Sequence, residues 1–422
     1  MEKAEFRTCS RGASHNFSRN RVLTFKKLII LIMFFKTSLQ RDLDRFFKAV
    51  SQSDFNIRAV TKGALSTARS KLNPEAFKRL NTVGVNAFYR DADYYIWGDY
   101  RVLAVDGTRL VLPNHPSVKE EFGEHGFGPH ADSKRSLAIG SLLYDVLNKV
   151  TTDSQIAPCS SSESELLRLH LEYVQAGDLL LLDRGCPSFW LLLMLKAKGI
   201  EFCVRLKENW WLKVKDFAES KEKERIVRFT LPGKNRSKLA GYPEYQQAGK
   251  EIVCRLIKVE LPDGTNEILC TSLLDRIEYP AEEFDELYHF RWGEEEAYKL
   301  LKSRIEIEDF SGKTAISVKQ DFYAKVFLMS LCALYAHPID EKVREEYRAD
   351  ENRKDDQQIN RTNALSMTQE ILISVFLKQQ FVKAFHAFDT IVEKTREIIR
   401  PGRSVERNKK PKKLYSMNYK KL

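Results

Sequence analysis

Hydrophobic and polar positions change their period along the chain, and the changes divide it into regions. Apolar residues recur at helical spacing over Leu23–Phe47, and further helical stretches follow at Thr61–Leu72 and from Pro74 onward. Proline suits the first turn of a helix, where its missing N–H is not needed. We expect residues 21–95 to form a helical domain, and residues 1–20, which are polar and without period, to be disordered.

From residue 96 to 207, runs of strand character alternate with helical patterns. The expected strands are Val102–Val105, Arg109–Leu112, Ser136–Tyr144, Asp178–Leu182 and Glu201–Leu206. The expected helices are Ser162–Val174 and Pro187–Lys198. The leucine run that ends at Leu182 is typical of a strand buried on both faces. This alternation predicts an α/β layer structure.

Residues 208–280 interrupt the alternation, with strand patterns at Arg225–Leu231, Ile252–Glu260 and Glu267–Ser272. We interpret this region as an all-β insertion. Helical pattern returns at Ala281, so we expect a second part of the core at 281–340 and a helical C-terminal region at 341–399. Residues 400–422 form a basic tail with nine Lys or Arg residues against one acid, Glu406, a composition typical of a segment that meets nucleic acid.

Composition narrows the classes of function. The 422 residues suggest two to four domains, and 43% hydrophobic with 30% charged residues is typical of a soluble globular chain. A net charge of +11 suits a polyanionic partner. Seven cysteines without a C-x-x-C pair argue against a zinc site or disulfide framework and favour a reducing cytoplasm. The longest apolar run, Leu28–Phe35, is too short for a membrane span of about 20 residues and predicts a buried helix instead.

Two aspartates stand at similar places in this pattern. Asp106 and Asp183 each follow a hydrophobic strand and precede a glycine-containing turn. Catalytic groups of open α/β sheets collect at that edge, and a carboxylate there is either exposed or meets a cation. Taken singly, either residue could equally be a turn or cap aspartate.

A third carboxylate belongs to the segment from Tyr288 to Lys302. On a helix of about 100° per residue, Tyr288, Arg291, Glu295 and Lys302 share a stripe roughly 60° wide, with Glu294 and Glu296 on either side of Glu295. One carboxylate flanked by two cations and a phenol suits a metal ligand among phosphate-binding groups. A solvated helix face with salt bridges at i, i+4 would give the same spacing.

The spacing Tyr288-x2-Arg291-x3-Glu295-x6-Lys302 resembles the signature of DDE transposases of the insertion sequence 4 family, with Asp106 and Asp183 at the two preceding acidic positions. The resemblance covers roughly residues 20–410. It implies an α/β fold with a ribonuclease-H-like core, a β insertion between the second aspartate and the glutamate, and N- and C-terminal helical regions. Cys186 departs from the aromatic residue that the family often carries there.

The resemblance also implies a chemistry. Asp106, Asp183 and Glu295 would be catalytic and would hold two Mg²⁺ ions, with Mn²⁺ able to substitute. Arg291 and Lys302 would bind phosphates of the transposon end, and Tyr288 would position the same strand. Trp292 would stack on a distorted base or, alternatively, pack in the core.

The expected partners are double-stranded DNA, as terminal inverted repeats and as target, and a second copy of the chain in a homodimer on DNA, with no membrane. The expected location is the bacterial cytoplasm, in association with the nucleoid. Two other functions remain open: a nuclease that cuts without joining, and a transposase that binds DNA without catalysis. Composition alone also leaves open whether residues 21–95 bind DNA or serve packing. His125, His130 and His170 lack ligand spacing, which favours structural roles.

Overall fold

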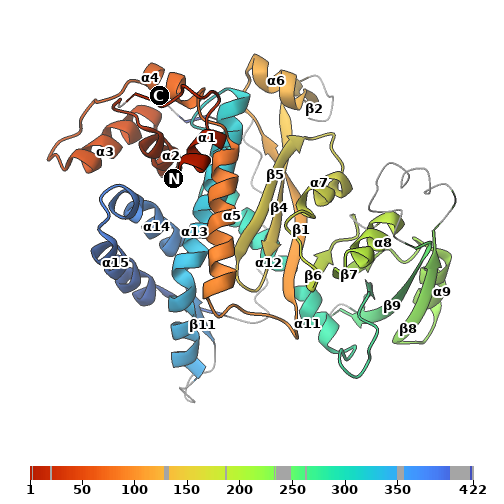
Figure 1. The fold of residues 1–422 in the computed structure, drawn as a ribbon. Helices are drawn as coiled ribbons and strands as arrows, with labels where there is room; N and C mark the ends of the chain where they lie inside the picture. The colour runs from red at the N-terminus through yellow and green to blue at the C-terminus, as the bar shows by residue number, and fades with distance from the viewer. Residues whose placement is uncertain are drawn as a thin grey trace.

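One eight-stranded sheet runs through the molecule in the computed structural model (Figure 1). Its strands, in spatial order, are β5 (Val150–Pro158), β4 (Leu137–Asp145), β1 (Arg101–Val111), β6 (Asp178–Leu182), β7 (Glu201–Leu206), β10 (Asn266–Thr271), β9 (Glu251–Glu260) and β8 (Glu224–Thr230). The structure describes all residues except 2, 20, 128–132, 186–187, 232, 234–248, 262–263, 349–355, 400–418 and 421–422. Cys186 and His130 therefore lie outside the described residues.

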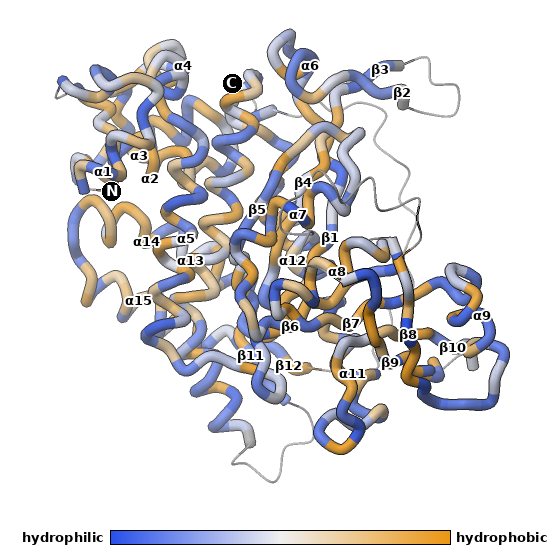
Figure 2. Tube along the Cα trace, turned by 45° about the vertical axis from the view of Figure 1, so that its right-hand side comes forward, coloured by the Kyte–Doolittle hydropathy of each residue, from blue (hydrophilic) through white to orange (hydrophobic). Residues whose placement is uncertain are grey.

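The first five strands of this order form the core. β1 pairs in parallel with β6, and β6 with β7, whereas β4 runs antiparallel to both β1 and β5. This mixed sheet confirms the predicted α/β class and the ribonuclease-H-like core. All five residues of β6 are buried, as the leucine run predicts. Figure 2 shows hydrophobic residues concentrated along these strands and the helices beside them.

Alternate residues of the core strands face two hydrophobic layers. Leu103, Val105, Leu180 and Leu182 pack in one layer, with residues of helices α7 (Glu163–His170) and α8 (Phe189–Ala197). Val102, Ala104, Leu179 and Leu181 pack in the other, with residues of α12 (Trp292–Ser303) and α13 (Ala315–Arg348). The period-two alternation of a strand thus places a helical layer on each face.

The structure corrects one boundary near the first aspartate. Two strands were expected, with Asp106 at the end of the first. Instead β1 is continuous from Arg101 to Val111, and its antiparallel pairing with β4 continues through Asp106 to Val111. Asp106 is therefore a mid-strand residue, because pairing with β4 carries the strand through the Asp-Gly sequence.

The insertion differs from the expected all-β unit. Its three strands form close to the predicted positions, as β8, β9 and β10, but they extend the core sheet through antiparallel pairing of β10 with β7. The insertion also contains a helix, α9 (Leu212–Glu219). Val214 and Phe217, three residues apart, bury its apolar side. The "all-β" prediction was therefore wrong for this segment.

The N-terminal region also differs from expectation. Residues 4–9, in the segment expected to be disordered, form helix α1 (Ala4–Cys9). The helical run from Leu23 to Phe47 is split into α2 (Phe25–Phe34) and α3 (Leu39–Ser51). The break occurs because the Asp42 carboxylate accepts hydrogen bonds from the backbone N–H groups of Lys36 and Thr37 at 2.8 Å each. Residues Leu28–Met33 are completely buried, which confirms the buried-helix interpretation.

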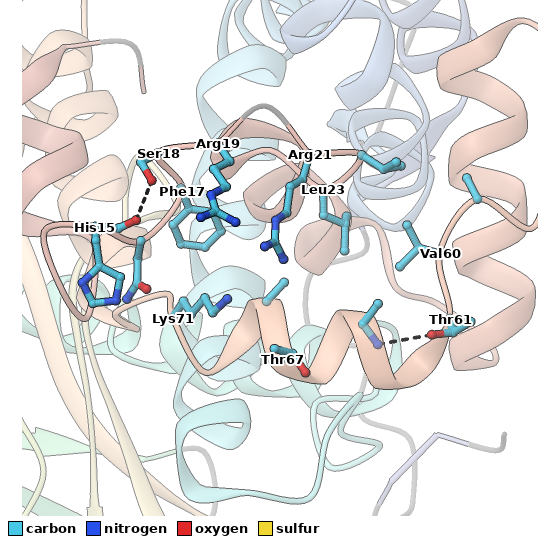
Figure 3. A pocket seen from close by; sticks show the side chains of 15 residues that line it. His15, Phe17, Ser18, Arg19, Arg21, Leu23, Val60, Thr61, Thr67 and Lys71 are labelled. Carbon is cyan, nitrogen blue, oxygen red and sulfur yellow. Dashed lines mark hydrogen bonds between the residues drawn. The ribbon is translucent and has the colours of Figure 1, made fainter.

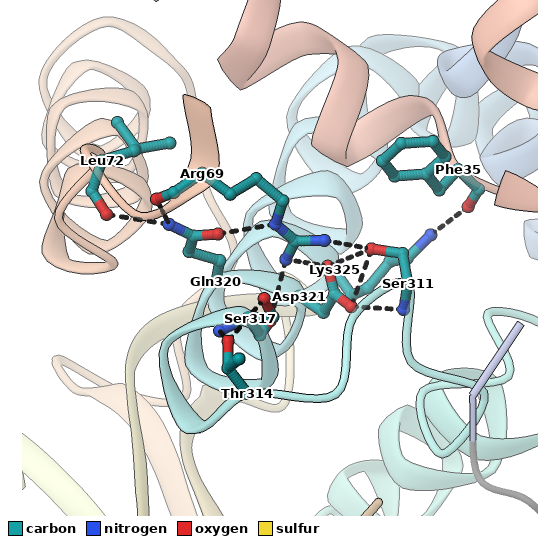
Figure 4. A network of polar contacts seen from close by, with 9 residues as sticks. All are labelled: Phe35, Arg69, Leu72, Ser311, Thr314, Ser317, Gln320, Asp321 and Lys325. Atoms are coloured by element: carbon teal, nitrogen blue, oxygen red, sulfur yellow. Dashed lines mark hydrogen bonds and ion pairs between the residues drawn. The ribbon is translucent and has the colours of Figure 1, made fainter. Parts of the chain in front are cut away.

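Helices α4 (Lys62–Arg69) and α5 (Glu75–Asp91) follow, and both are joined to the core. On α5, Asn81 donates to the carbonyl of Thr151 on β5 at 2.8 Å. At the end of α4, buried Arg69 donates to Gln320 at 2.8 Å and pairs with Asp321 at 2.8 Å on α13 (Figure 4). The N-terminal helices are thus part of the layer that covers the sheet, and not a separately packed unit.

Helix α13 crosses residue 340, where a domain boundary was expected, so that boundary is wrong. The helix is long and apolar enough to cross a membrane, but 83% of its most apolar window is buried inside the molecule, which is the burial of a core helix. The remaining elements are α6 (Pro116–Phe122), β2 (His125–Phe127), β3 (Ser133–Arg135), α11 (Glu283–His289), β11 (Gln357–Ile359), α14 (Arg361–Phe376), α15 (Phe381–Lys394) and β12 (Arg396–Ile398).

The basic tail at 400–422 lies outside the described residues except for Tyr419 and Lys420. Lys420 is 3% exposed, and its ammonium donates to the carbonyl of Lys36 at 2.7 Å. This cation therefore belongs to the packing of the molecule and is not available to DNA.

Candidate active site

The two aspartates lie next to each other on neighbouring parallel strands. The register of β1 and β6 pairs Val105 with Leu182, and Asp106 and Asp183 are the residues that follow. The two carboxylates interact electrostatically, since Asp183 is among the groups that raise the pKa of Asp106. The parallel pairing thus brings together two groups that are 77 residues apart in sequence.

The pKa values of the two carboxyls are shifted in opposite directions. Burial raises the pKa of Asp106, and Glu163 and Asp183 raise it further, against the lowering effect of the Gly107 N–H and Arg291. Burial also acts to raise the pKa of Asp183, but the Arg184 N–H and Arg205 lower it overall. Arg205 on β7 donates to Asp183 Oδ1 through Nε at 3.0 Å and Nη2 at 2.7 Å.

Glu295 approaches this pair from the helical layer. It lies in the first turn of α12, and its carboxylate is 3.5 Å from Arg291 Nη2. Arg291 is 4% exposed. Burial lowers the pKa of Arg291, but Tyr288, Asp183, Asp106 and Glu295 together raise it. All three predicted acids therefore interact electrostatically with one buried guanidinium.

The helix that carries the signature is not continuous. Tyr288 lies in α11 and Glu295 in α12, with Phe290 and Arg291 between the two helices. The predicted proximity of Arg291 and Glu295 is nevertheless present, because Arg291 keeps helical dihedrals. A single straight helix was expected, and that part of the prediction was wrong.

The donor set suits a hard divalent cation. Three carboxylates from three elements, all of them partly exposed, supply only oxygen ligands, which Mg²⁺ and Mn²⁺ prefer. In the part of the chain that the structure describes, no three His, Cys, Asp or Glu side chains stand at metal-ligand spacing. The Arg291 guanidinium is a positive charge that interacts electrostatically with all three acids.

The other signature residues lie around the same site. The Tyr288 hydroxyl donates to the carbonyl of Leu182, directly before Asp183, at 3.4 Å. The Lys302 ammonium donates to the carbonyl of Arg109 on β1 at 2.7 Å, and burial lowers its pKa. Trp292 is 47% exposed with the Arg291 guanidinium 5.4 Å from its ring, so the alternative that it packs in the core was wrong.

Sequence reasoning missed a second group of residues at Asp106. Glu294 is completely buried, and its Oε1 accepts from the Asp106 N–H at 2.8 Å. Burial raises the pKa of Glu294 well above its usual range, and Asp106 adds to the shift. Tyr298, one turn further along α12, donates to the Asp106 carbonyl at 2.7 Å. The i, i+4 spacing was visible in the sequence, but not which face of the helix meets β1.

Ser141 on β4 also donates to the Asp106 carbonyl, at 3.0 Å. Its hydroxyl lies 2.9 Å from His170 Nε2, and His170 Nδ1 lies 2.7 Å from Asp153. This serine, histidine and aspartate have the order of a nucleophilic triad, but all three are buried and Ser141 is only 2% exposed. A substrate cannot reach the hydroxyl, so His170 has the structural role that its sequence context favours.

Similarity to known proteins agrees with this site. Residues 97–332, more than half of the chain, match the family described as "Transposase DDE domain". A mixed α/β core that presents paired aspartates and a helical glutamate defines the class, and the chain belongs to this transposase DDE domain family. The predicted family resemblance is thereby confirmed.

The chain is also similar to individual transposases. The transposase InsG for insertion sequence element IS4 of Escherichia coli (strain K12) is 23% identical over 253 residues, which are 58% of this chain and 54% of that protein. The match thus spans about half the length of this curated relative. The cryo-EM structure of the piggyBac transposase synaptic complex with hairpin DNA has a TM-score of 0.44 at 10% identity and covers 92% of this chain and 78% of that chain.

Proposed function

We propose that this protein is a DDE transposase that moves an insertion element by cut-and-paste transposition, through metal-dependent phosphodiester hydrolysis and strand transfer. The observation that carries the proposal is that Asp106 and Asp183 directly follow paired residues of two parallel strands, while Glu295 lies 3.5 Å from Arg291, a buried cation that interacts electrostatically with both aspartates. Carboxylates from different elements can hold the pair of metal ions that catalyses in-line displacement at phosphorus. Membership of the transposase DDE domain family supports the same chemistry.

Asp106, Asp183 and Glu295 are the proposed metal ligands, for two Mg²⁺ ions, with Mn²⁺ able to substitute. When bound, such ions lower the pKa of the attacking water or 3′-hydroxyl and stabilise the leaving oxygen. Arg205 keeps the pKa of Asp183 low and its carboxylate oriented, so this ligand is ionised at neutral pH. The Glu295 side chain is 29% exposed, so its carboxylate is accessible to a metal ion.

Arg291, Lys302, Tyr288 and Trp292 are the proposed contacts to the transposon end. Arg291 is almost fully buried, and its guanidinium interacts electrostatically with all three carboxylates, so a phosphate that it binds would lie close to the proposed metal ligands. A bidentate guanidinium suits a phosphate held at that point. Trp292, half exposed beside Arg291, offers its ring face to a base that has left the duplex.

A second place for DNA is a cavity of about 860 Å³ between residues 15–23 and helix α4 (Figure 3). Arg19, Arg21 and Lys71 line it, together with His15, and no acidic residue does. Among the described residues, these three cations have no ion-pair partner. Such a cluster suits the phosphate backbone, which supports a DNA-binding role for the helical region 21–95.

We also propose how the protein assembles on DNA and where in the cell it acts. Terminal inverted repeats and target DNA are the proposed partners, and a homodimer forms in the DNA complex. The proposed location is the bacterial cytoplasm, at the nucleoid. In functional terms, residues 96–207 supply Asp106 and Asp183, residues 208–280 are an insertion, and the helical segment that follows supplies Glu295.

The test uses purified protein, Mg²⁺ and a supercoiled plasmid that carries the inverted repeats found beside the gene. Asp106→Asn, Asp183→Asn and Glu295→Gln should each abolish cleavage and joining while end binding is retained, because the carboxylates serve the reaction and not the main DNA contacts. Glu296→Gln, an exposed acid on the same helix, is the control and should leave both steps unchanged.

Pre-cut ends separate the alternatives. A transposase joins them to a target plasmid, whereas a nuclease on the same core cuts the plasmid and joins nothing. A wild-type protein that binds the ends but neither cuts nor joins with Mg²⁺ or Mn²⁺ would contradict the proposal.

A further inference from the structure

Side chains of helix α12 form hydrogen bonds with β1 at the backbone of Asp106. The N–H of Asp106 donates to Glu294 Oε1 at 2.8 Å, and its carbonyl accepts from the Tyr298 hydroxyl at 2.7 Å. Both backbone groups of a mid-strand residue are therefore satisfied by side chains of one helix. Backbone groups inside a sheet ordinarily pair with the neighbouring strand, so this exchange is specific to the position of Asp106.

The Tyr298 hydroxyl lies within the ladder of β1 and β4. It accepts from the Leu142 N–H at 3.0 Å and donates to the Asp106 carbonyl at 2.7 Å. Leu142 is the residue that faces Asp106 in the strand register. The hydroxyl thus bridges the two strands at this position.

Glu294 and Tyr298 are one helical turn apart, so both side chains point from the same face of α12. Both are buried, at 0% and 7% exposure. Because the two contacts lie one turn apart, they fix both the position of α12 along its axis and its rotation about that axis. Glu295 lies about 100° around the helix from Glu294, which places it on the adjoining, partly exposed flank.

A third contact reaches the same carbonyl from the other side. Ser141 donates to the Asp106 carbonyl at 3.0 Å and is connected through His170 to Asp153. Lys78 of α5 pairs with Asp153 at 3.3 Å. The Asp106 backbone is therefore bound by side chains of α12 and, through Ser141 and His170, is connected to α7 and to Lys78 of α5.

We propose that Glu294 and Tyr298 are positioning residues, which bind the Asp106 backbone and thereby set the position of Glu295 relative to Asp106 and Asp183, the other two proposed metal ligands. The inference rests on the proposed function for the identity of the ligands. Neither residue touches the metal or the DNA. Both act through the placement of α12, and an error of about 1 Å at such a site is enough to weaken it.

The experiment measures Mn²⁺ binding to the full chain without DNA, by electron paramagnetic resonance of free Mn²⁺. Tyr298→Phe removes only the hydroxyl and should raise the half-saturating Mn²⁺ concentration about tenfold or more, as loss of a group that orients a ligand does. Tyr335→Phe is the matched control, because Tyr335 is largely buried on α13 and its hydroxyl has no hydrogen bond among the described residues. It should leave the Mn²⁺ affinity unchanged.

A double-mutant comparison separates positioning from general loosening. If Tyr298 acts through Glu295, adding Tyr298→Phe to Glu295→Gln should weaken Mn²⁺ binding no further. Wild-type affinity in Tyr298→Phe, or an equal further loss in the Glu295→Gln background, would overturn the proposal.

Glu294 provides a second test that does not depend on the folding of Tyr298→Phe. Glu294→Gln keeps an oxygen that accepts the Asp106 N–H and should retain most of the Mn²⁺ affinity, whereas Glu294→Leu should lose it. Equal affinity in the two variants overturns the role of Glu294. Because the binding assay contains no DNA, Mn²⁺ binding without cleavage would count against the proposed function alone.

Discussion

At the scale of single residues, Lys325 is a buried charge outside the candidate site. It lies on α13, is 5% exposed, and donates to the carbonyl of Phe35 at 2.5 Å. Burial, together with a smaller effect of Lys420, lowers its pKa from 10.5 to about 8. Below pH 8 the side chain is charged in both the folded and unfolded states, so the folded state bears the full desolvation penalty.

Lys325→Met should therefore stabilise the protein by an amount that depends on pH. The penalty is complete at pH 7 and disappears as the pH rises towards the unfolded pKa of about 10.5. The difference in unfolding free energy between variant and wild type should fall by about 2 to 3 kcal/mol from pH 7 to pH 10. Urea unfolding at both pH values measures it. Lys383→Met, at an exposed position on α15, should give a difference that does not change with pH.

The sequence predicted residues whose position depends on strand pattern, and missed those that depend on packing. Asp183 was located because a leucine run of strand length ends at Leu182. Asp106 was identified, but its place inside a longer strand depends on pairing with β4, which is not visible in a single segment. Glu294 looked like one of three similar acids. Only the packing of α12 against β1 distinguishes it from Glu295 and Glu296.

At the scale of elements, α13 packs closely against the sheet at Gly140 on β4. A Cβ added there would lie 2.9 Å from Cε2 of Phe322 and 3.1 Å from Cδ1 of Leu110. Phe322 and Leu110 are completely buried, so neither ring nor methyl can move away without disturbing the core. Glycine at this position lets the long helix pack directly on the strand that faces Asp106.

Gly140→Ala should destabilise the protein by about 1 to 3 kcal/mol, the usual effect of overpacking a core. The measurement is urea unfolding at neutral pH. Gly63→Ala on α4 is the control with the opposite expected sign, because its Cβ would meet only Thr61 Oγ1 at 4.0 Å and alanine favours a helix by about 1 kcal/mol. An unchanged midpoint for Gly140→Ala would mean that α13 can shift away from β4.

The types of most elements could be predicted, but not how they join. The strands β8, β9 and β10 appeared in the sequence as alternating runs, whereas their attachment to β7 is a long-range pairing. The run from Leu23 to Phe47 was helical in pattern, yet the Asp42 carboxylate ends one helix before the next begins. Helix α13 continues past residue 340 even though Pro338 lies inside it, so local breaker signals did not mark its end.

At the scale of the whole molecule, the excess of positive charge is unevenly placed. Nine of the Lys and Arg residues lie in the last 23 positions, with a single acid among them. Lys420 is already engaged with Lys36 and Asp309, which leaves the cations further upstream in the tail for DNA. Contacts of this kind bind phosphates with little sequence preference.

Replacing Lys409, Lys410, Lys412 and Lys413 with glutamine should weaken DNA binding and flatten its salt dependence. The slope of log K against log salt should fall by about 0.9 for each phosphate that the tail no longer binds. Fluorescence anisotropy with one transposon end, across a salt series, measures the slope. Arginine at the same four positions keeps the charge and should keep the slope. A slope that glutamine leaves unchanged would show that the tail does not touch DNA.

The number of catalytic sites in one chain bears on how the protein assembles. An element has two ends, whereas each chain has one set of three carboxylates, so coupling cleavage to pairing of the ends would prevent single-ended breaks. Of two apolar stretches that could join subunits, Asp321–Ala336 is mostly buried inside the molecule, whereas α15 leaves Val382 85% exposed. The net charge of +11 disfavours contact between free subunits, and bound DNA would neutralise that repulsion.

We therefore expect a dimer only when two ends are bound, with each end cut by the subunit that holds mainly the other end. The test mixes wild-type protein with an Asp183→Asn partner whose end-binding region recognises a second sequence. Trans catalysis places the cut at the end bound by the inactive partner, because the intact carboxylates belong to the wild-type subunit. Cleavage confined to the end bound by the wild-type subunit would show that each core cuts its own end. Sedimentation of the free protein tests the other half of the expectation, and a stable dimer at low concentration would contradict the dependence on DNA.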